Sequence, residues 1–210
     1  MLKISIIILV VLFLLWSIHS LWISRVPEMR YRVVKKLGQV ELRSYEECLL
    51  ATVVLDTPVD NQSIYRGFNK LASYINGQNQ LQSSIKMTAP VLEANAKIAM
   101  TAPILSSQGD TSAPTLSFVM PMQFTKSTLP QPDDSSIQIQ SLPTRTMAVM
   151  TYGGYATRAR VEAKKKRLLA LLQQQAIPTS GEVLSARFNP PWTMPLLMKN
   201  EVMVEVQPIP

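Results

Sequence analysis

The chain has 210 residues and a formal net charge of +7, from 21 Lys and Arg residues against 14 Asp and Glu residues, and this length fits one ordinary domain. Two short segments, 25–36 and 158–167, carry the positive excess, and the rest apart from Lys3 is slightly acidic, which argues against a nucleic-acid binder. The single cysteine, Cys48, excludes an intramolecular disulfide and a cysteine-based zinc site. The single histidine, His19, excludes a Ser-His-Asp triad unless His19 itself takes part.

Residues 4–23 form an apolar run in which sixteen of the twenty residues are apolar and none carries a permanent charge. About twenty such residues in a helix match the hydrocarbon core of a bilayer, which is roughly 30 Å thick. Trp16 and Trp22 lie toward one end, as interface anchors do, and no A-x-A-like cleavage site follows. We therefore expect residues 1–24 to be a retained single-pass transmembrane anchor rather than a cleaved signal peptide. The basic residues beside it favour a cytoplasmic domain, but the short N-terminal tail leaves the side open.

The residues after this anchor predict the same order of elements twice. The first set comprises a strand hairpin, a helix and two further strands, over residues 31–36, 40–55, 60–76, 98–105 and 116–120. The second set comprises two strand-like runs divided by Pro143, a helix and two closing strands, over residues 136–152, 155–177, 183–188 and 201–206. Alternating and β-branched residues indicate the strands, and apolar residues three or four apart indicate the helices. In the first helix, this spacing predicts a buried stripe of Ile64, Phe68, Leu71 and Ile75.

Neither set of elements is large enough to bury a sheet of its own. The sequence therefore predicts one α+β domain over residues 25–210. We expect a pseudo-twofold, curved antiparallel sheet or β-barrel built from two β-α-β-β repeats, with the two helices packed on its outside.

A short motif is duplicated in the first half of the chain. Residues 85–90 and 98–103 both contain Met-Thr-Ala-Pro, thirteen residues apart. Because this separation is odd, the two copies cannot share one face of an uninterrupted strand, and we expect a turn or bulge at residues 93–96. Met100 and Ala102 alternate along the second copy, so both are expected to point inward. Met100 is therefore a candidate either for the core or for an apolar ligand cleft.

No pattern in the sequence indicates catalysis or a metal site. Glu46 and Glu47 are adjacent in a predicted strand, so their side chains point to opposite faces, and the sequence has no glycine-rich phosphate-binding motif. Arg66 and Lys70 lie four residues apart on the first helix, off its apolar stripe, as does Tyr74. These cations could bind the carboxylates of an amphipathic ligand, or they could lie on a solvated helix face.

The second predicted helix begins with the basic run Arg158–Arg167. A solvated outer face is one explanation of this run. Contact with anionic membrane lipid is the other, because the predicted anchor would hold the domain close to a bilayer.

Several segments together resemble the SOUL heme-binding protein family. They occur in the family's order, cover about residues 30–206, and comprise 40–46, 67–77, 97–103, 118–121, 129–132, 186–193 and 200–202. The doubled Met-Thr-Ala-Pro is similar to bacterial members. The resemblance implies a pseudo-twofold barrel that binds heme or other tetrapyrroles in an apolar surface cleft beside the first helix, without known catalysis. It also implies that Arg66 and Lys70 correspond to basic residues that meet the propionates.

The chain departs from the family in one respect, because it has no histidine after His19. An iron ligand could come only from Met, Tyr, Cys or Lys, or be absent. We therefore expect a monomeric, membrane-anchored carrier or buffer that holds heme or another porphyrin non-covalently. The candidate cofactor-binding residues are Arg66, Lys70, Tyr74 and Met100.

Two other functions remain open at this point. The first is an enzyme that acts on a hydrophobic small molecule, with Tyr152 or Glu201 as the candidate base. The second is a scaffold that binds another membrane protein through its basic helix. Titration of the domain with hemin distinguishes both from a tetrapyrrole carrier.

Overall fold

The computed structural model describes residues 2–23, 28–57, 59–94 and 113–207. Its helices are α1 (Leu2–Ile23), α2 (Asn61–Ile75), α3 (Arg158–Gln174) and the short 3₁₀ helix η1 (Pro195–Leu197). Its strands are β1 (Tyr31–Leu37), β2 (Val40–Tyr45), β3 (Cys48–Val54), β4 (Val91–Ala94), β5 (Thr115–Val119), β6 (Gln138–Leu142), β7 (Arg145–Gly153), β8 (Thr179–Arg187) and β9 (Lys199–Val206).

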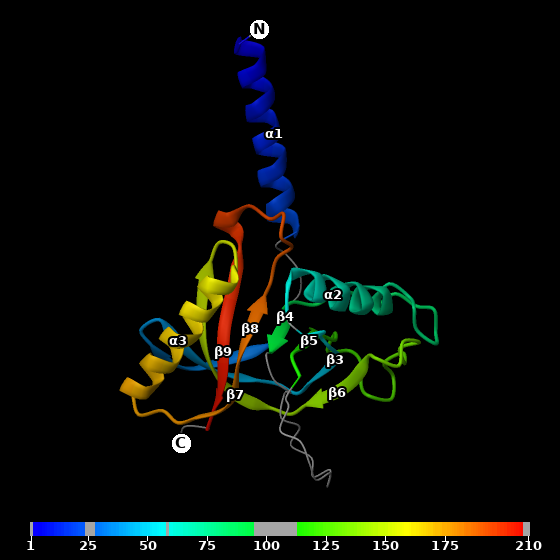
Figure 1. The fold of residues 1–210 in the computed structure, drawn as a ribbon, viewed down its shortest axis with the longest axis vertical. Coiled ribbons are helices and arrows are strands. Elements are labelled where there is room, and N and C mark those ends of the chain that lie inside the picture. The colour runs from blue at the N-terminus through cyan, green and yellow to red at the C-terminus, as the bar shows by residue number, and fades with distance from the viewer. Residues whose placement is uncertain (1, 24–27, 58, 95–112, 208–210) are drawn as a thin grey trace.

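The strands form one antiparallel sheet in the order β1-β2-β7-β9-β8-β4-β5-β3-β6 (Figure 1). Without β1, this order is symmetric about the contact between β4 and β8, which confirms the predicted repeat. Each half places its second, third and fourth strands together, as β3, β5 and β4 or as β7, β9 and β8. The first strand of each half, β2 or β6, pairs with the other half, so the two units are exchanged at their edges. The described strands form a curled sheet, which together with helices α2 and α3 makes an α+β fold. The end strands of the sheet, β1 and β6, do not pair with each other.

Two of the predicted strand boundaries were wrong. Residues 40–55 form two strands rather than one, because the chain leaves the β7 side of the sheet at the exposed Glu46 and Glu47 and crosses to the β5 side. Glu93 and Ala94 continue β4 instead of forming a turn, since this strand begins directly after the first Met-Thr-Ala-Pro. The predicted strand over 98–105, together with Met100, lies outside the described residues.

Helices α2 and α3 pack on the sheet over the two halves of the repeat (Figure 1). One hydrophobic cluster joins α2 to β3 and β5, and a second joins α3 to β7 and β9. A third cluster fills the opposite face of the sheet, because side chains alternate between faces along a strand. Its most deeply buried members are Leu50, Val119, Val149 and Ala186.

Helix α2 turns a different face to the sheet than its apolar spacing predicts. Its buried residues are Ser63, Gly67, Leu71, Tyr74 and Ile75. Phe68, predicted to be buried, is 37% exposed, while Gly67 allows close approach because a Cβ atom there would lie 2.6 Å from a Leu55 methyl group. The helix begins at a capping box in which the Asp60 carboxylate accepts a hydrogen bond from the Ser63 backbone.

Helix α1 extends away from the sheet at the end where the β8–β9 loop lies (Figure 1). The Trp16 indole N–H donates a hydrogen bond to the backbone carbonyl of Trp192 in that loop, at 2.9 Å. Within the described ranges, no helix combines the length and the apolarity that crossing a bilayer requires. The transmembrane anchor therefore stays a prediction from the sequence.

Candidate functional site

Arg66 and Lys70 lie on one flank of α2, and each has a partner from the same chain. The Arg66 guanidinium donates to the Asp56 carboxylate at 2.8 and 3.1 Å. The Lys70 ammonium donates to the Ser136 hydroxyl at 3.2 Å. Both cations are exposed, so a carboxylate ligand can reach them from solvent. It would have to compete with Asp56 for Arg66, and such exposed pairs contribute only about 0.2–1 kcal/mol each.

Tyr74 does not share this flank. Its side chain is 1% exposed, and its hydroxyl donates to the Pro130 carbonyl at 2.7 Å. Burial raises the pKa of Tyr74 to about 12. The structure therefore places Tyr74 in the core between α2 and the sheet and does not bring it together with Arg66 and Lys70.

Two exposed aromatic residues lie on the outer part of α2, and one of them, Phe68, was predicted from its spacing to be buried. Tyr65 is 65% exposed, and Phe68 packs edge-on against Phe118 with ring centroids 5.2 Å apart. By helical periodicity, Tyr65 lies between Phe68 on one flank and Arg66 on the other. We call Tyr65, Arg66, Phe68 and Lys70 the α2 surface. An apolar ring with acidic substituents matches this arrangement of aromatic and cationic groups.

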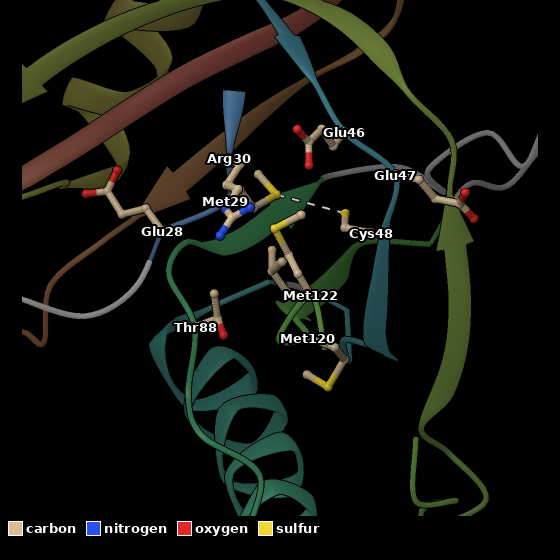
Figure 2. A pocket seen from close by; sticks show the side chains of 10 residues that line it. Glu28, Met29, Arg30, Glu46, Glu47, Cys48, Thr88, Met120 and Met122 are labelled. Carbon is tan, nitrogen blue, oxygen red and sulfur yellow. Dashed lines mark hydrogen bonds between the residues drawn. The ribbon is translucent and has the colours of Figure 1, made fainter. Parts of the chain in front are cut away.

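A separate small pocket opens on the sheet face opposite α2 (Figure 2). Its lining comprises Glu28, Met29, Arg30, Glu46, Glu47, Cys48, Thr88, Val119, Met120 and Met122. Its cavity volume is about 20 Å³, enough for roughly one water molecule and far below the range of roughly 300–1,000 Å³ that is typical of sites for drug-sized ligands. A tetrapyrrole is therefore too large to be enclosed there.

The sulfur atoms of this pocket come from distant parts of the sequence. The Cys48 Sγ lies 3.9 Å from the Met29 Sδ, and Met122 points toward both of them (Figure 2). The methionine-rich composition was visible in the sequence, but nothing in the spacing joined these three residues. The surroundings of Cys48 are apolar enough to change its acidity, because burial raises the pKa of its thiol to about 11.

Cys48 is expected to react slowly with thiol reagents at neutral pH. A rise of the pKa from 9.0 to about 11 lowers the thiolate fraction about 100-fold, since each pKa unit is a factor of ten. Iodoacetamide alkylation of the native protein, followed by mass spectrometry from pH 7 to 10, measures this, and the single cysteine makes the site unambiguous. Glutathione and the urea-unfolded chain are the controls. A native rate within a few fold of the unfolded rate at pH 8 would contradict the expectation.

The two candidate bases for an enzyme, Tyr152 and Glu201, do not share a site. Thr151 is the sheet partner of Glu201, and its hydroxyl donates to the Glu201 carboxylate at 3.1 Å. Tyr152 is the next residue along β7 and so faces the other side of the sheet, where it packs in the α3 cluster. Burial raises the pKa of the Tyr152 phenol, which makes it a weaker acid.

Glu201 belongs to a buried charge network. The Glu201 side chain has no exposed surface, and one carboxylate oxygen accepts a hydrogen bond from Arg43 at 2.9 Å. Arg43 also pairs with Glu41 at 2.8 Å and stacks on the Tyr31 ring at 4.2 Å. Burial opposes the charge on Arg43, but the Glu201 carboxylate and the Tyr45 hydroxyl together outweigh this effect and raise the pKa of Arg43. Arg43 and Glu201 therefore form a buried ion pair between β2 and β9.

Two curated relatives of this chain are heme-binding proteins. Heme-binding protein 2 of Mus musculus is 25% identical over 176 residues, which cover 80% of this chain and 82% of that protein. Heme-binding protein 1 of Sus scrofa is 29% identical over 165 residues, which cover 77% of this chain and 81% of that protein.

Solved structures share the curled sheet at low sequence identity. The C-terminal domain of EcmrR has a TM-score of 0.55 and 12% identity, covering 86% of this chain and all of that domain. A hydrolase from Listeria innocua has a TM-score of 0.50 and 15% identity, covering 83% of this chain and 94% of that structure. These likenesses concern the fold alone. The family described as SOUL heme-binding protein matches residues 26–205, and the chain belongs to that family.

Proposed function

We propose that this protein binds heme or another tetrapyrrole non-covalently on the α2 surface and acts as a carrier or buffer. Family membership over residues 26–205 supports the ligand class. The observation that carries the proposal is the position of the exposed Arg66 and Lys70 on one flank of α2 next to the exposed Tyr65, with Phe68 beyond Tyr65 on the other flank. This surface offers apolar contact to the macrocycle and cationic partners to its propionates.

Binding on this surface does not depend on a histidine–iron bond, because the chain has no histidine after His19. The α2 surface contains tyrosine, arginine, phenylalanine and lysine side chains. Of these residue types, tyrosine is a known ligand of heme iron. A macrocycle without iron should therefore bind nearly as well as heme, through the displacement of water from apolar surface.

Membrane anchoring through residues 1–24 is the second part of the proposal. It rests on the apolar composition of residues 4–23 and on the absence of a cleavage signal after them. A single anchor would keep the binding domain close to one membrane face, where tetrapyrroles partition because of their apolar rings.

The test compares hemin with metal-free protoporphyrin on the full-length protein. Arg66→Ala/Lys70→Ala is expected to weaken both ligands about tenfold, because two exposed ion pairs are lost, and the difference should shrink in salt. Absorbance and fluorescence titrations measure the affinities.

Lys166→Ala/Arg167→Ala is the matched control, since it removes two exposed charges from α3 and leaves α2 intact. Binding of hemin alone would replace the proposed mechanism with a protein–iron bond. If neither ligand bound, the tetrapyrrole function would be wrong for this chain.

A further inference from the structure

The end of the domain from which α1 emerges is built from two loops that are bonded to each other. The Gly154 N–H donates to the Pro195 carbonyl at 3.2 Å, and the Asn200 amide donates to the Gly154 carbonyl at 2.7 Å. The first bond joins the β7–α3 loop to the β8–β9 loop, and the second joins the β7–α3 loop to β9, which follows the β8–β9 loop. Figure 1 shows the β8–β9 loop directly below α1. The Trp16–Trp192 hydrogen bond connects this loop to the helix itself.

Three large apolar side chains are exposed on these two loops. Leu196 is 91% exposed, Trp192 is 60% exposed and Tyr155 is 47% exposed. Single exposed apolar residues are ordinary, but a group of them on adjoining loops indicates an interaction surface. Two exposed arginines, Arg158 and Arg160, open α3 immediately after the first loop. We call Tyr155, Arg158, Arg160, Trp192 and Leu196 the apical surface.

The chemistry of the apical surface fits the headgroup region of an anionic bilayer. Trp and Tyr concentrate at membrane–water interfaces, where the ring lies against apolar chains and the polar atom stays hydrated. A leucine at a loop tip can enter the acyl boundary, as the apolar face of an interfacial helix does. Arginines beside them are attracted to anionic lipid.

The point on α1 at which Trp16 bonds to Trp192 sets the depth of the apical surface in the membrane. Trp16 lies seven residues before Ile23, so at the helical rise of 1.5 Å per residue its hydrogen bond to Trp192 is roughly 10 Å from the end of α1. Apolar side chains of interfacial elements enter the headgroup and acyl boundary by about 5–10 Å. If α1 is in the bilayer, Trp192 is therefore at interface depth.

We propose that the apical surface docks into the interface of an anionic membrane, with Trp192 and Leu196 inserted, and so fixes the domain against the bilayer. The inference rests on the proposal that residues 1–24 are a membrane anchor. It adds a second membrane contact, separate from the anchor and from the α2 surface.

A probe at Leu196 tests the insertion in the full-length protein. In a Cys48→Ser background, Leu196→Cys is labelled with the environment-sensitive dye NBD and reconstituted into nanodiscs with or without phosphatidylserine. We expect severalfold brighter, blue-shifted emission that lipid-borne quenchers reduce. Gln175→Cys, an exposed position at the other end of α3, is the control, and its probe should stay dim in both kinds of nanodisc.

Three further results separate the possible failures. Release of the protein by alkaline carbonate would overturn the anchor. Retention in the membrane with an aqueous, unquenched probe at residue 196 would overturn the apical docking and leave the anchor intact. With Arg158 and Arg160 present, the probe at residue 196 should be quenched more in nanodiscs that contain phosphatidylserine than in those that lack it. Arg158→Ala/Arg160→Ala should remove this difference. Equal quenching in both nanodiscs when both arginines are present would contradict recognition of anionic lipid.

Discussion

Glu201→Ala is expected to lower the free energy of unfolding by about 3–5 kcal/mol, because it removes the fully buried one of the two carboxylates that pair with a buried arginine. The Arg43 side chain is 5% exposed, and its Nη1 atom lies 2.9 Å from the Glu201 carboxylate. Arg43 keeps Glu41 at 2.8 Å, but Glu41 is closer to solvent and also pairs with Lys36. Urea denaturation followed by circular dichroism measures the loss.

Two further variants make this prediction specific to the ion pair. Arg43→Met/Glu201→Leu replaces both charges with apolar groups of similar size, and it should recover most of the stability lost in Glu201→Ala. Glu46→Gln, a change at an exposed carboxylate, should alter the free energy of unfolding by less than about 0.5 kcal/mol. A double variant no more stable than Glu201→Ala would mean that the loss does not come from leaving Arg43 unpaired.

The repeat could be predicted from the sequence because it depends on local patterns. The alternation in β9 and the seven- and four-residue spacing of apolar residues in α3 are properties of short segments. The exchange of β2 and β6 between the halves could not be predicted, since pairing partners are set by the assembled sheet. The exposed Glu46 and Glu47 mark where the chain changes sides, but in the sequence they follow Glu41, Arg43 and Ser44 and are not distinguished from these other polar residues.

The candidate site was predicted in part for the same reason. Arg66 and Lys70 share a flank because they lie four residues apart on a helix, which is a local property. Their partners, Asp56 and Ser136, come from other elements and have no signal in the spacing. Tyr74 can be buried in the core because its hydroxyl donates a hydrogen bond to the Pro130 carbonyl, 56 residues away in the chain.

The apolar spacing in the sequence predicted the wrong orientation of α2 about its own axis. Ile64, Phe68, Leu71 and Ile75 fit an apolar stripe, but Gly67 is the residue that lets the helix approach β3 closely. The buried face is therefore centred nearer Gly67 and Leu71, and Phe68 moves toward solvent. This rotation makes Phe68 available to a ligand, whereas the predicted stripe would have buried it.

If α2 has this orientation, Leu71→Ala should mainly lower stability, whereas Phe68→Ala should mainly weaken ligand binding. Leu71 has no exposed surface, so its truncation should cost about 2–5 kcal/mol of unfolding free energy. Phe68 is 37% exposed and contacts Phe118 edge-on, so its truncation should cost only about 1 kcal/mol. Phe68→Ala should instead weaken protoporphyrin binding, since it removes apolar surface from the α2 surface. Urea denaturation and fluorescence titration of both variants measure the two quantities, and equal losses of stability would show that Phe68 is buried as its spacing alone predicts.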